Sequence, residues 1–242
     1  MPTEWYKSGH VLRTWEDCVM AAKKSPSGGA PSPAKPRASR RPDRPSSAAK
    51  YDAKRQEIID IAARVFAEKG FHATSIDDLV EATGLQRGGL YHYIDGKLDL
   101  LLAIHERFID PLLANTREIV AEDLAPDETL RRLANALMQD IAGYRDQVTV
   151  FLHEWRVLQA TPGWEDVHAA RHEFESVIES VLVRGKREGV FAASEPRLMT
   201  YAFLGMFNYA YTWYDPSGLR SPDEIAERFV GIFLDGIVSR HR

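Results

Sequence analysis

The chain has 242 residues, of which 44% are hydrophobic and 27% are charged, and its formal net charge is −4 at pH 7. A chain of this length buries enough surface to fold without covalent crosslinks, and its single cysteine, Cys18, excludes an internal disulfide. No apolar run is long enough to cross a bilayer, so the sequence predicts a cytoplasmic protein without membrane contact.

Positive charge gathers in the first fifty residues. Residues 1–50 carry ten Lys or Arg and four acidic residues, a net charge of +6, which leaves −10 on the remainder. Prolines recur between residues 25 and 50 and apolar side chains are almost absent there, so we expect residues 1–50 to form a disordered basic extension. Its arginine cluster suits either a non-specific phosphate-binding arm or a solvated linker: Arg37, Arg40, Arg41 and Arg44. Met20 is followed by Ala-Ala-Lys-Lys, which is typical of a natural start, so we expect residues 1–19 to be an upstream extension.

From Tyr51 onward the hydrophobic pattern is helical. Ile58, Ala62 and Phe66 repeat every four residues, which predicts an amphipathic helix that ends at Gly70. No period-two alternation bounded by hairpin turns follows in the sequence. The sequence therefore predicts an all-α fold.

A second, short helix is expected to begin at Thr74, where Asp77 completes a T-x-x-D capping arrangement, and to end at Gly84. Residues 86–93 predict another short helix, with Leu90 facing the one before it. Two short helices across a glycine turn indicate a helix-turn-helix, which we assign to a DNA-binding domain over residues 51–97.

The second helix of this pair carries side chains suited to reading DNA. In a helix-turn-helix that helix enters the major groove with its N-terminal residues towards the base edges. The Gln86 amide matches adenine, the Arg87 guanidinium matches guanine, and Gly88 permits close approach. Groups suited to gripping phosphates are supplied by Thr74, Tyr91, His92 and Lys97. Each of these residues, taken singly, also fits a helical hairpin inside a larger bundle.

Between Glu57 and Leu101 the chain resembles the tetracycline-repressor (TetR) family of regulators, through the segment IIDIAARVFAEKGFHATSIDDLVEATGLQRGGLYHYIDGKLDLL. The resemblance implies a three-helix DNA-binding head followed by a ligand-binding helical body that dimerises. It also implies DNA-contact roles for Thr74, Gln86, Arg87, Gly88, Tyr91, His92 and Lys97. Gln86 and Gly89 depart from the residues common in the family, which leaves the base preference open.

Residues 98–242 predict a helical body for effector binding and dimerisation. The expected helices run from Lys97 to about Ile119, then over 126–144, 148–159, 164–189, 196–214 and 222–240. The last two are apolar on more than one side, as expected for helices with more than one partner surface. Core packing accounts for most such residues, and the resemblance implies a four-helix dimer interface, for which the candidates are Tyr209, Trp213, Phe229, Phe233 and Ile237.

An effector pocket inside this body is expected to be largely apolar. Ten residues are candidates for its lining: Met138, Ile141, Phe151, Trp155, Leu158, Phe174, Ile178, Val181, Phe203 and Phe207. An ordinary filled core explains the same pattern equally well. The segment YAYTWYDPSGLRSPDEIAERFVGIFLDGI, residues 209–237, resembles TetR-type repressors of fatty-acid and sterol breakdown that respond to acyl-CoA thioesters. Cations for the phosphates of such a ligand are available at Arg156, Arg171, Arg184, Lys186 and Arg187.

His168 and His172 are spaced for one helix face, and His153 precedes Glu154, but this signal is weak and we expect no metal site. No nucleophile motif or glycine-rich phosphate loop supports an enzyme. The sequence thus predicts a homodimeric repressor that binds a palindromic operator in double-stranded DNA and is released by a hydrophobic small molecule, such as an acyl-CoA, with no other cofactor. The alternative is a helix-turn-helix protein without an effector.

Overall fold

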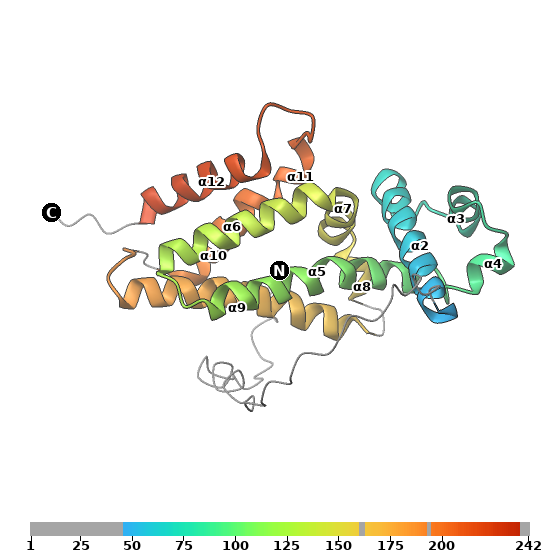
Figure 1. Cartoon of the computed structure of the whole chain (residues 1–242), viewed down its shortest axis with the longest axis horizontal. Coiled ribbons are helices and arrows are strands. Elements are labelled where there is room, and N and C mark those ends of the chain that lie inside the picture. The colour runs from blue at the N-terminus through green and yellow to red at the C-terminus, as the bar shows by residue number, and fades with distance from the viewer. Residues whose placement is uncertain (1–45, 160–162, 193–194, 238–242) are drawn as a thin grey trace, which may run out of the picture. The chain divides into compact units, whose positions relative to one another are not determined.

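The computed structural model describes residues 46–159, 163–192 and 195–237, with α-helices and no β-strand in those ranges. Figure 1 shows the helices in chain order, from α2 to α12. The expected all-α fold is confirmed. Residues 1–45, which hold most of the predicted basic extension, lie outside the described residues.

The first described helix, α2 (Ser47–Lys69), begins earlier than expected. The Ser46 hydroxyl accepts a hydrogen bond from the Ala49 backbone N–H at 3.1 Å, which caps the helix. Residues 47–50, assigned to the extension by composition, therefore form the first turn of α2. At the other end Gly70 has φ +81°, as expected for a helix that terminates at a glycine.

Three helices build the head together with the start of a long fourth one. They are α2, α3 (Ile76–Thr83) and α4 (Arg87–Tyr91), and α5 (Lys97–Ala121) follows. Their apolar side chains form one buried cluster that includes Phe66, Leu79, Leu90 and Ile104. Val150 and Leu158, which come from much later in the chain, belong to the same cluster. The head core is therefore completed by residues outside the predicted domain 51–97.

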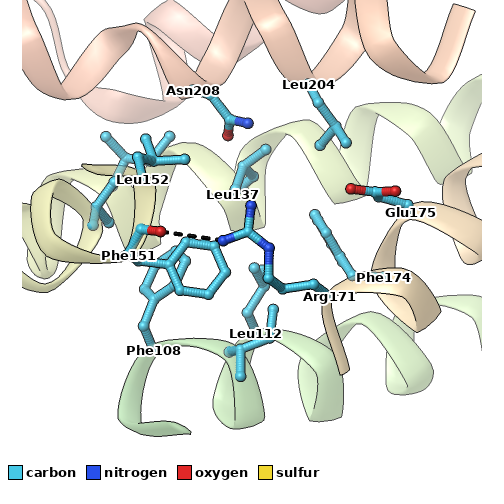
Figure 2. Close-up of a pocket in the computed structure, with 13 residues that line it drawn as sticks. Phe108, Leu112, Leu137, Phe151, Leu152, Arg171, Phe174, Glu175, Leu204 and Asn208 are labelled. Carbon is cyan, nitrogen blue, oxygen red and sulfur yellow. Dashed lines mark hydrogen bonds between the residues drawn. The ribbon is translucent and has the colours of Figure 1, made fainter. Parts of the chain in front are cut away.

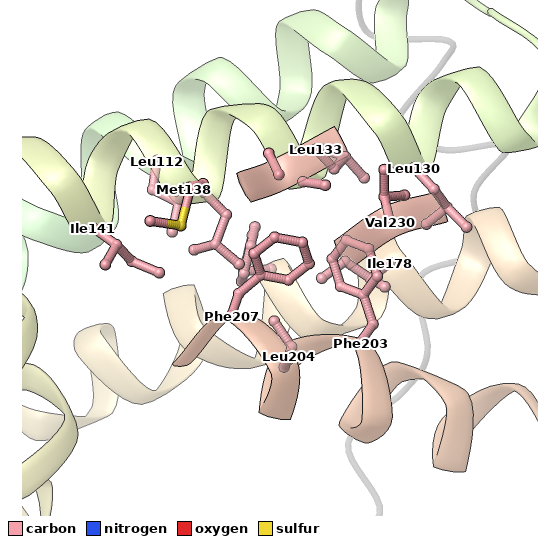
Figure 3. Close-up of a cluster of buried hydrophobic side chains, with 14 of the residues drawn as sticks. Leu112, Leu130, Leu133, Met138, Ile141, Ile178, Phe203, Leu204, Phe207 and Val230 are labelled. Atoms are coloured by element: carbon pink, nitrogen blue, oxygen red, sulfur yellow. The ribbon is translucent and has the colours of Figure 1, made fainter. Parts of the chain in front are cut away.

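The body contains the second half of α5 and seven further helices. These are α6 (Pro126–Gly143), α7 (Arg145–His153), α8 (Trp155–Leu158), α9 (Trp164–Arg187), α10 (Pro196–Asn208), α11 (Ala210–Trp213) and α12 (Pro222–Ile237). A second apolar cluster fills the space between them (Figure 3). Phe203 and Phe207 lie at its centre, with their ring centroids 5.1 Å apart. α5 contributes Leu101 and Ile104 to the head cluster and Phe108 and Leu112 to the body cluster, so one helix crosses both cores.

Two predicted helices are each broken in two. The helix expected over 148–159 divides at Glu154 into α7 and α8, and the one over 196–214 divides at Tyr209 into α10 and α11. Neither break carries a glycine or proline, so the sequence pattern held no signal for them. At Glu154 the break coincides with a tertiary contact, in which its carboxylate bonds to the backbone of the head.

α12 packs along α6 (Figure 1). Asp223 in the first turn of α12 accepts hydrogen bonds from the amides of Asn135 and Gln139 on α6, both at 2.6 Å. These bonds hold the pKa of Asp223 below its usual value. The same bonds position α12 on the body, and the face of α12 that carries Ile232 stays exposed.

Candidate DNA-binding head and effector cavity

The first helix of the helix-turn-helix is capped one residue later than predicted. Ser75, rather than Thr74, is the N-cap: its hydroxyl accepts from the Asp78 N–H at 3.1 Å, and Asp78 accepts from the Ser75 N–H at 2.7 Å. Lys69 donates to the same carboxylate at 2.6 Å, and together these donors hold the pKa of Asp78 well below its usual range. The T-x-x-D arrangement with Asp77 is therefore wrong, because S-x-x-D one position on forms the reciprocal capping box.

Two residues predicted to grip phosphates have internal partners. Thr74 is 2% exposed and its hydroxyl donates to the Gly70 carbonyl at 2.8 Å. The Lys97 ammonium donates to the carbonyls of Phe71 and Thr74, both at 2.6 Å, and lies 4.4 Å from the centre of the Phe71 ring. Both side chains therefore bond the backbone of the loop between α2 and α3.

The residues at the start of α4 are exposed. Gln86 is the N-cap residue and its side chain makes no capping bond. Arg87 has a side chain 58% exposed and pairs with Asp77 on α3 at 2.5 Å. A Cβ at Gly88 would meet no atom within 4 Å, so nothing in the folded chain requires a glycine there. Leu90, fully buried, anchors the opposite face of the helix.

An aromatic cluster fixes the end of α4. Tyr91 and His92 are exposed, and the Tyr51 hydroxyl donates to the His92 carbonyl at 3.2 Å. Tyr51 also stacks on Tyr93, with ring centroids 4.9 Å apart. Sequence reasoning missed Tyr51, since it lies on α2, forty residues before the helix that it supports, and no local pattern relates the two.

A small cavity of about 40 Å³ lies within the body (Figure 2). Three of the ten predicted lining residues border it: Ile141, Phe151 and Phe174. Seven other apolar side chains and three polar ones complete the lining: Phe108, Ile109, Leu112, Leu137, Val148, Leu152, Leu204, Arg171, Glu175 and Asn208.

The other predicted lining residues lie elsewhere. Five belong to the filled core of the body: Met138, Ile178, Val181, Phe203 and Phe207. Leu158 is part of the head core, and the Trp155 ring lies 6.5 Å from that of Trp164. An inward-facing helical stripe does not reveal which neighbour it meets, which is why the sequence could not separate cavity from core.

Arg171 is the cation at this cavity. Its Nη1 donates to the Phe151 carbonyl at 3.1 Å, and its guanidinium carbon lies 4.2 Å from the centre of the Phe151 ring. Burial lowers the pKa of Arg171, and the charge of Glu175 opposes that shift. Of the five cations considered for a CoA ligand, Arg171 alone borders the cavity; Arg184 bonds instead to Asp123 at 3.0 Å.

α7 connects this cavity to the head. Val148, Phe151 and Leu152 on α7 border the cavity. On the same helix, Gln147 donates to Asp60 of α2 at 3.0 Å. Just beyond it, Glu154 accepts from the Phe71 N–H at 3.0 Å.

Asp60 itself is shared between two helices of different parts of the fold. Arg107 of α5 binds it with two nitrogens, at 2.9 and 3.0 Å, and Gln147 of α7 binds the same carboxylate. Hydrogen bonds therefore tie α2 to α5 and α7, two of the helices that line the cavity.

The outer face of the C-terminal helices carries exposed apolar side chains. Tyr209 and Ile232 are each 66% exposed and Trp213 is 45% exposed. Phe229 is partly buried against the core, and Phe233, predicted at the dimer interface, is only 6% exposed because it packs edge-on against Phe203. Nothing is described of the Ile237 side chain.

The histidines whose spacing was considered as a weak signal for a metal site do not converge. His153 bonds the Tyr211 hydroxyl, and His172 lies 3.3 Å from the Ser176 hydroxyl. Within the described ranges no group of three or more His, Cys, Asp or Glu is placed to hold a metal ion. Among the helices of those ranges, none is long and apolar enough to span a membrane.

A three-helix head whose third helix, α4, exposes its N-terminal residues, joined to an α-helical body with a cavity, defines a helix-turn-helix transcriptional regulator. Two family models match the chain: "Bacterial regulatory proteins, tetR family" over residues 58–104, and "Tetracyclin repressor-like, C-terminal domain" over residues 123–237. The HTH-type transcriptional repressor KstR2 of Rhodococcus jostii is 32% identical over 189 residues, covering 78% of this chain and 93% of that protein. The chain belongs to the TetR family, and the expectation of a regulator rather than an enzyme is confirmed by these relatives.

Solved structures agree with this assignment. The ketosteroid transcriptional regulator KstR2 of Mycobacterium tuberculosis matches with a TM-score of 0.73 and 26% identity, over 77% of this chain and 96% of that one. AibR in complex with isovaleryl coenzyme A and operator DNA matches with a TM-score of 0.67 and 26% identity, over 74% of this chain and 97% of that one.

Proposed function

We propose that this TetR-family regulator is a cytoplasmic homodimer that represses transcription by binding a palindromic operator, and that a hydrophobic small molecule filling the body releases it. The observation that carries the proposal is α7, whose residues border the cavity and hydrogen-bond to the head. An acyl-CoA thioester is a candidate effector, since the AibR relative was solved with one.

For DNA contact, the exposed start of α4 supports base reading by Gln86 and Arg87, with Gly88 giving room for the groove edge. Exposed Tyr91 and His92 are suited to phosphates. Thr74 and Lys97 contribute indirectly, because they hold the loop before α3 in place and do not contact DNA themselves. In a two-fold dimer the two heads would meet half-sites about 34 Å apart.

Dimerisation through α10, α11 and α12 is supported by the exposed apolar side chains on that face. Tyr209, Trp213 and Ile232 leave apolar surface in water that a second copy would cover. Phe229, whose ring lies 5.9 Å from that of Trp213, would support this face from beneath.

We expect release to act through displacement of the cavity walls. Small-molecule pockets commonly occupy roughly 300–1,000 Å³, whereas this cavity has about 40 Å³. A ligand must therefore push its walls apart, and Phe151 cannot move far without displacing the two residues of the same segment that hold the head, Gln147 and Glu154. A coupling of roughly 1–3 kcal/mol would weaken operator binding about 5- to 150-fold.

The test has two stages. Purified protein first selects its operator from random duplex DNA, and palindromic enrichment is expected. The affinity for that operator is then measured by fluorescence anisotropy with and without acyl-CoAs, fatty acids, steroids and aromatic drugs. If no compound that raises the melting temperature changes operator affinity, the proposed release is wrong.

A second candidate is a helix-turn-helix regulator without an effector. The small volume of the cavity, about 40 Å³, favours it. A thermal-shift screen in which no compound class raises the melting temperature would support this alternative, because a ligand that binds the native state must stabilise it.

A further inference from the structure

The lining of the body cavity is apolar except at one end. Ten of its residues are aliphatic or aromatic, and the three polar ones are Arg171, Glu175 and Asn208. Figure 2 shows the Arg171 guanidinium reaching between Phe151 and Leu137, with Asn208 beyond it and Glu175 to one side. A charged group therefore stands among hydrocarbon walls.

Most N–H donors of the Arg171 guanidinium have no hydrogen-bond acceptor among the described residues. The guanidinium has five N–H donors, and its one hydrogen bond within the described parts of the chain runs from Nη1 to the Phe151 carbonyl. Among the residues that the structure describes, it forms no ion pair within 4.0 Å; Glu175 acts on it through the longer-range attraction of its charge. Stacking on the Phe151 ring holds the group in place without neutralising it.

A half-buried cation with no hydrogen-bonded anionic partner is unfavourable, because desolvation penalises the charge and Glu175 opposes that penalty only through its longer-range attraction. A carboxylate is the partner that matches a guanidinium fork, with two parallel N–H···O bonds. The ten apolar side chains would surround the carbon skeleton of the same ligand. Glu175 on the same wall would repel a group of higher negative charge, which favours a monoanion over a phosphate.

We infer that Arg171 anchors the carboxylate of a compact, apolar monocarboxylic acid, whose hydrocarbon part lies between α5, α6, α7 and α9. This inference rests on the proposed effector cavity and names the chemical class that the cavity selects. It differs from a CoA thioester, in which the acyl group is uncharged and the negative charge lies on distant phosphates.

The test compares three probes with the same carbon chain: hexanoate, hexanamide and hexanoyl-CoA. Binding to the full chain is measured by titration calorimetry and by the shift in melting temperature. We expect hexanoate to bind at least ~10-fold more tightly than hexanamide, and Arg171→Gln to remove that difference while Arg171→Lys retains part of it. Arg117→Gln, which changes an exposed arginine paired with Glu173, is the matched control and should leave the preference for hexanoate intact.

Glu175→Gln provides a second route if Arg171→Gln does not fold. Removal of the neighbouring negative charge should tighten hexanoate binding and leave hexanamide unaffected. The inference is overturned if the amide binds as well as the acid, if hexanoyl-CoA binds more tightly than hexanoate with the same dependence on Arg171, or if Glu175→Gln changes both ligands equally. An acid that binds through Arg171 without altering operator affinity would leave this inference standing and refute only the proposed release.

Discussion

The Glu154 carboxylate accepts a hydrogen bond from the backbone N–H of Phe71 at 3.0 Å, although 83 positions separate the two residues. Phe71 follows Gly70, at the point where α2 ends and the chain turns towards the helix-turn-helix. Lys97 holds the carbonyl of that same Phe71. The two backbone polar groups of one residue in the head are therefore held separately, the N–H by Glu154 of the body and the carbonyl by Lys97 at the start of α5.

Replacement of Glu154 with Ala should uncouple the head from the cavity. The Phe71 N–H loses its partner, so displacement of α7 is no longer transmitted to the loop before α3. We expect the effector-induced loss of operator affinity to shrink at least ~5-fold, the lower range of allosteric coupling, while effector binding persists. Anisotropy titrations with and without effector measure this, and Glu154→Gln, which keeps an acceptor oxygen, should behave like the unaltered protein.

The matched control for that experiment is Glu118→Ala, an exposed glutamate on α5. It should leave the coupling unchanged. Equal coupling in Glu154→Ala and Glu118→Ala would show that the Glu154 contact carries no signal.

Arg87→Ala should reduce sequence discrimination rather than overall DNA binding. A bidentate base contact contributes roughly 1–3 kcal/mol, so the preferred operator should lose about 5- to 150-fold in affinity while unrelated duplexes change little. Asp77→Ala is the control, because it removes the carboxylate that pairs with Arg87 at 2.5 Å and leaves the guanidinium available. Competition binding against scrambled DNA measures the ratio, and a uniform loss on all sequences would assign Arg87 to phosphates instead.

Ile232→Arg should dissociate the proposed dimer. Ile232 is 66% exposed on α12, and two-fold symmetry would bring two like charges into one interface. Sedimentation equilibrium should give a monomer mass, and operator affinity should fall with it. Val183→Arg, which alters an apolar side chain 48% exposed on α9, should remain dimeric; a dimer in both variants would place the interface elsewhere.

Gly185→Ala should destabilise the end of α9. The added Cβ would lie 2.1 Å from Cδ2 of Phe191, whose ring is buried against this turn. Overpacking of this kind costs about 1–3 kcal/mol. Urea denaturation measures the change, and Gly143→Ala, where a Cβ meets nothing within 4 Å, should be neutral or stabilising. Equal stability of the two variants would mean that Phe191 repacks freely.

His105 should make the free energy of unfolding depend on pH. It is fully buried on α5 between the two cores, and burial lowers its pKa from 6.5 to about 4. The unfolded chain therefore takes up a proton below pH 6.5 that the folded chain refuses, so stability from the neutral histidine is present above pH 6.5 and is lost as pH falls to about 4. The loss amounts to about 1.4 kcal/mol per pH unit.

That dependence is isolated by subtracting the stability of His105→Leu from that of the unaltered protein at each pH between 4 and 7. The difference should decline as pH falls. Asp140 should give the opposite sign in the same experiment with Asp140→Asn, because burial raises its pKa to about 6 and its stabilising protonated form is lost as pH rises through that value. A flat difference for His105→Leu would contradict the buried neutral state.

The parts of the fold that the sequence predicted have strong local signals. Gly70 and Pro126 mark helix boundaries through backbone chemistry alone, and the structure places boundaries there. The break at Glu154 has no such signal, since it depends on a partner 83 residues away. Local chemistry therefore marks these helix boundaries, whereas the break at Glu154 coincides with a distant contact that no local pattern shows.

The candidate site divides in the same way. The sequence predicted that Gln86 and Arg87 lie exposed at the start of a short helix, and they do, because polar and charged side chains there have no reason to be buried. Lys97 was expected to face DNA, yet its carbonyl partners come from a loop whose path is not encoded in its own neighbourhood. The cavity was harder still, since Met138 and Ile141 lie on one helix but only Ile141 borders it.

The passage of α5 through both cores bears on attempts to build hybrid regulators. Leu100 and Ile104 of α5, Val150 of α7 and Leu158 of α8 complete the head core. A head cut after Lys97 and fused to another body would expose that apolar surface, whatever operator it was meant to read. A head that keeps its core must therefore be transferred as a discontinuous unit, with α2 to α5 accompanied by α7 and α8. To change the ligand to which such a protein responds, the residues that line the cavity must be replaced, instead of one whole body being joined to another head.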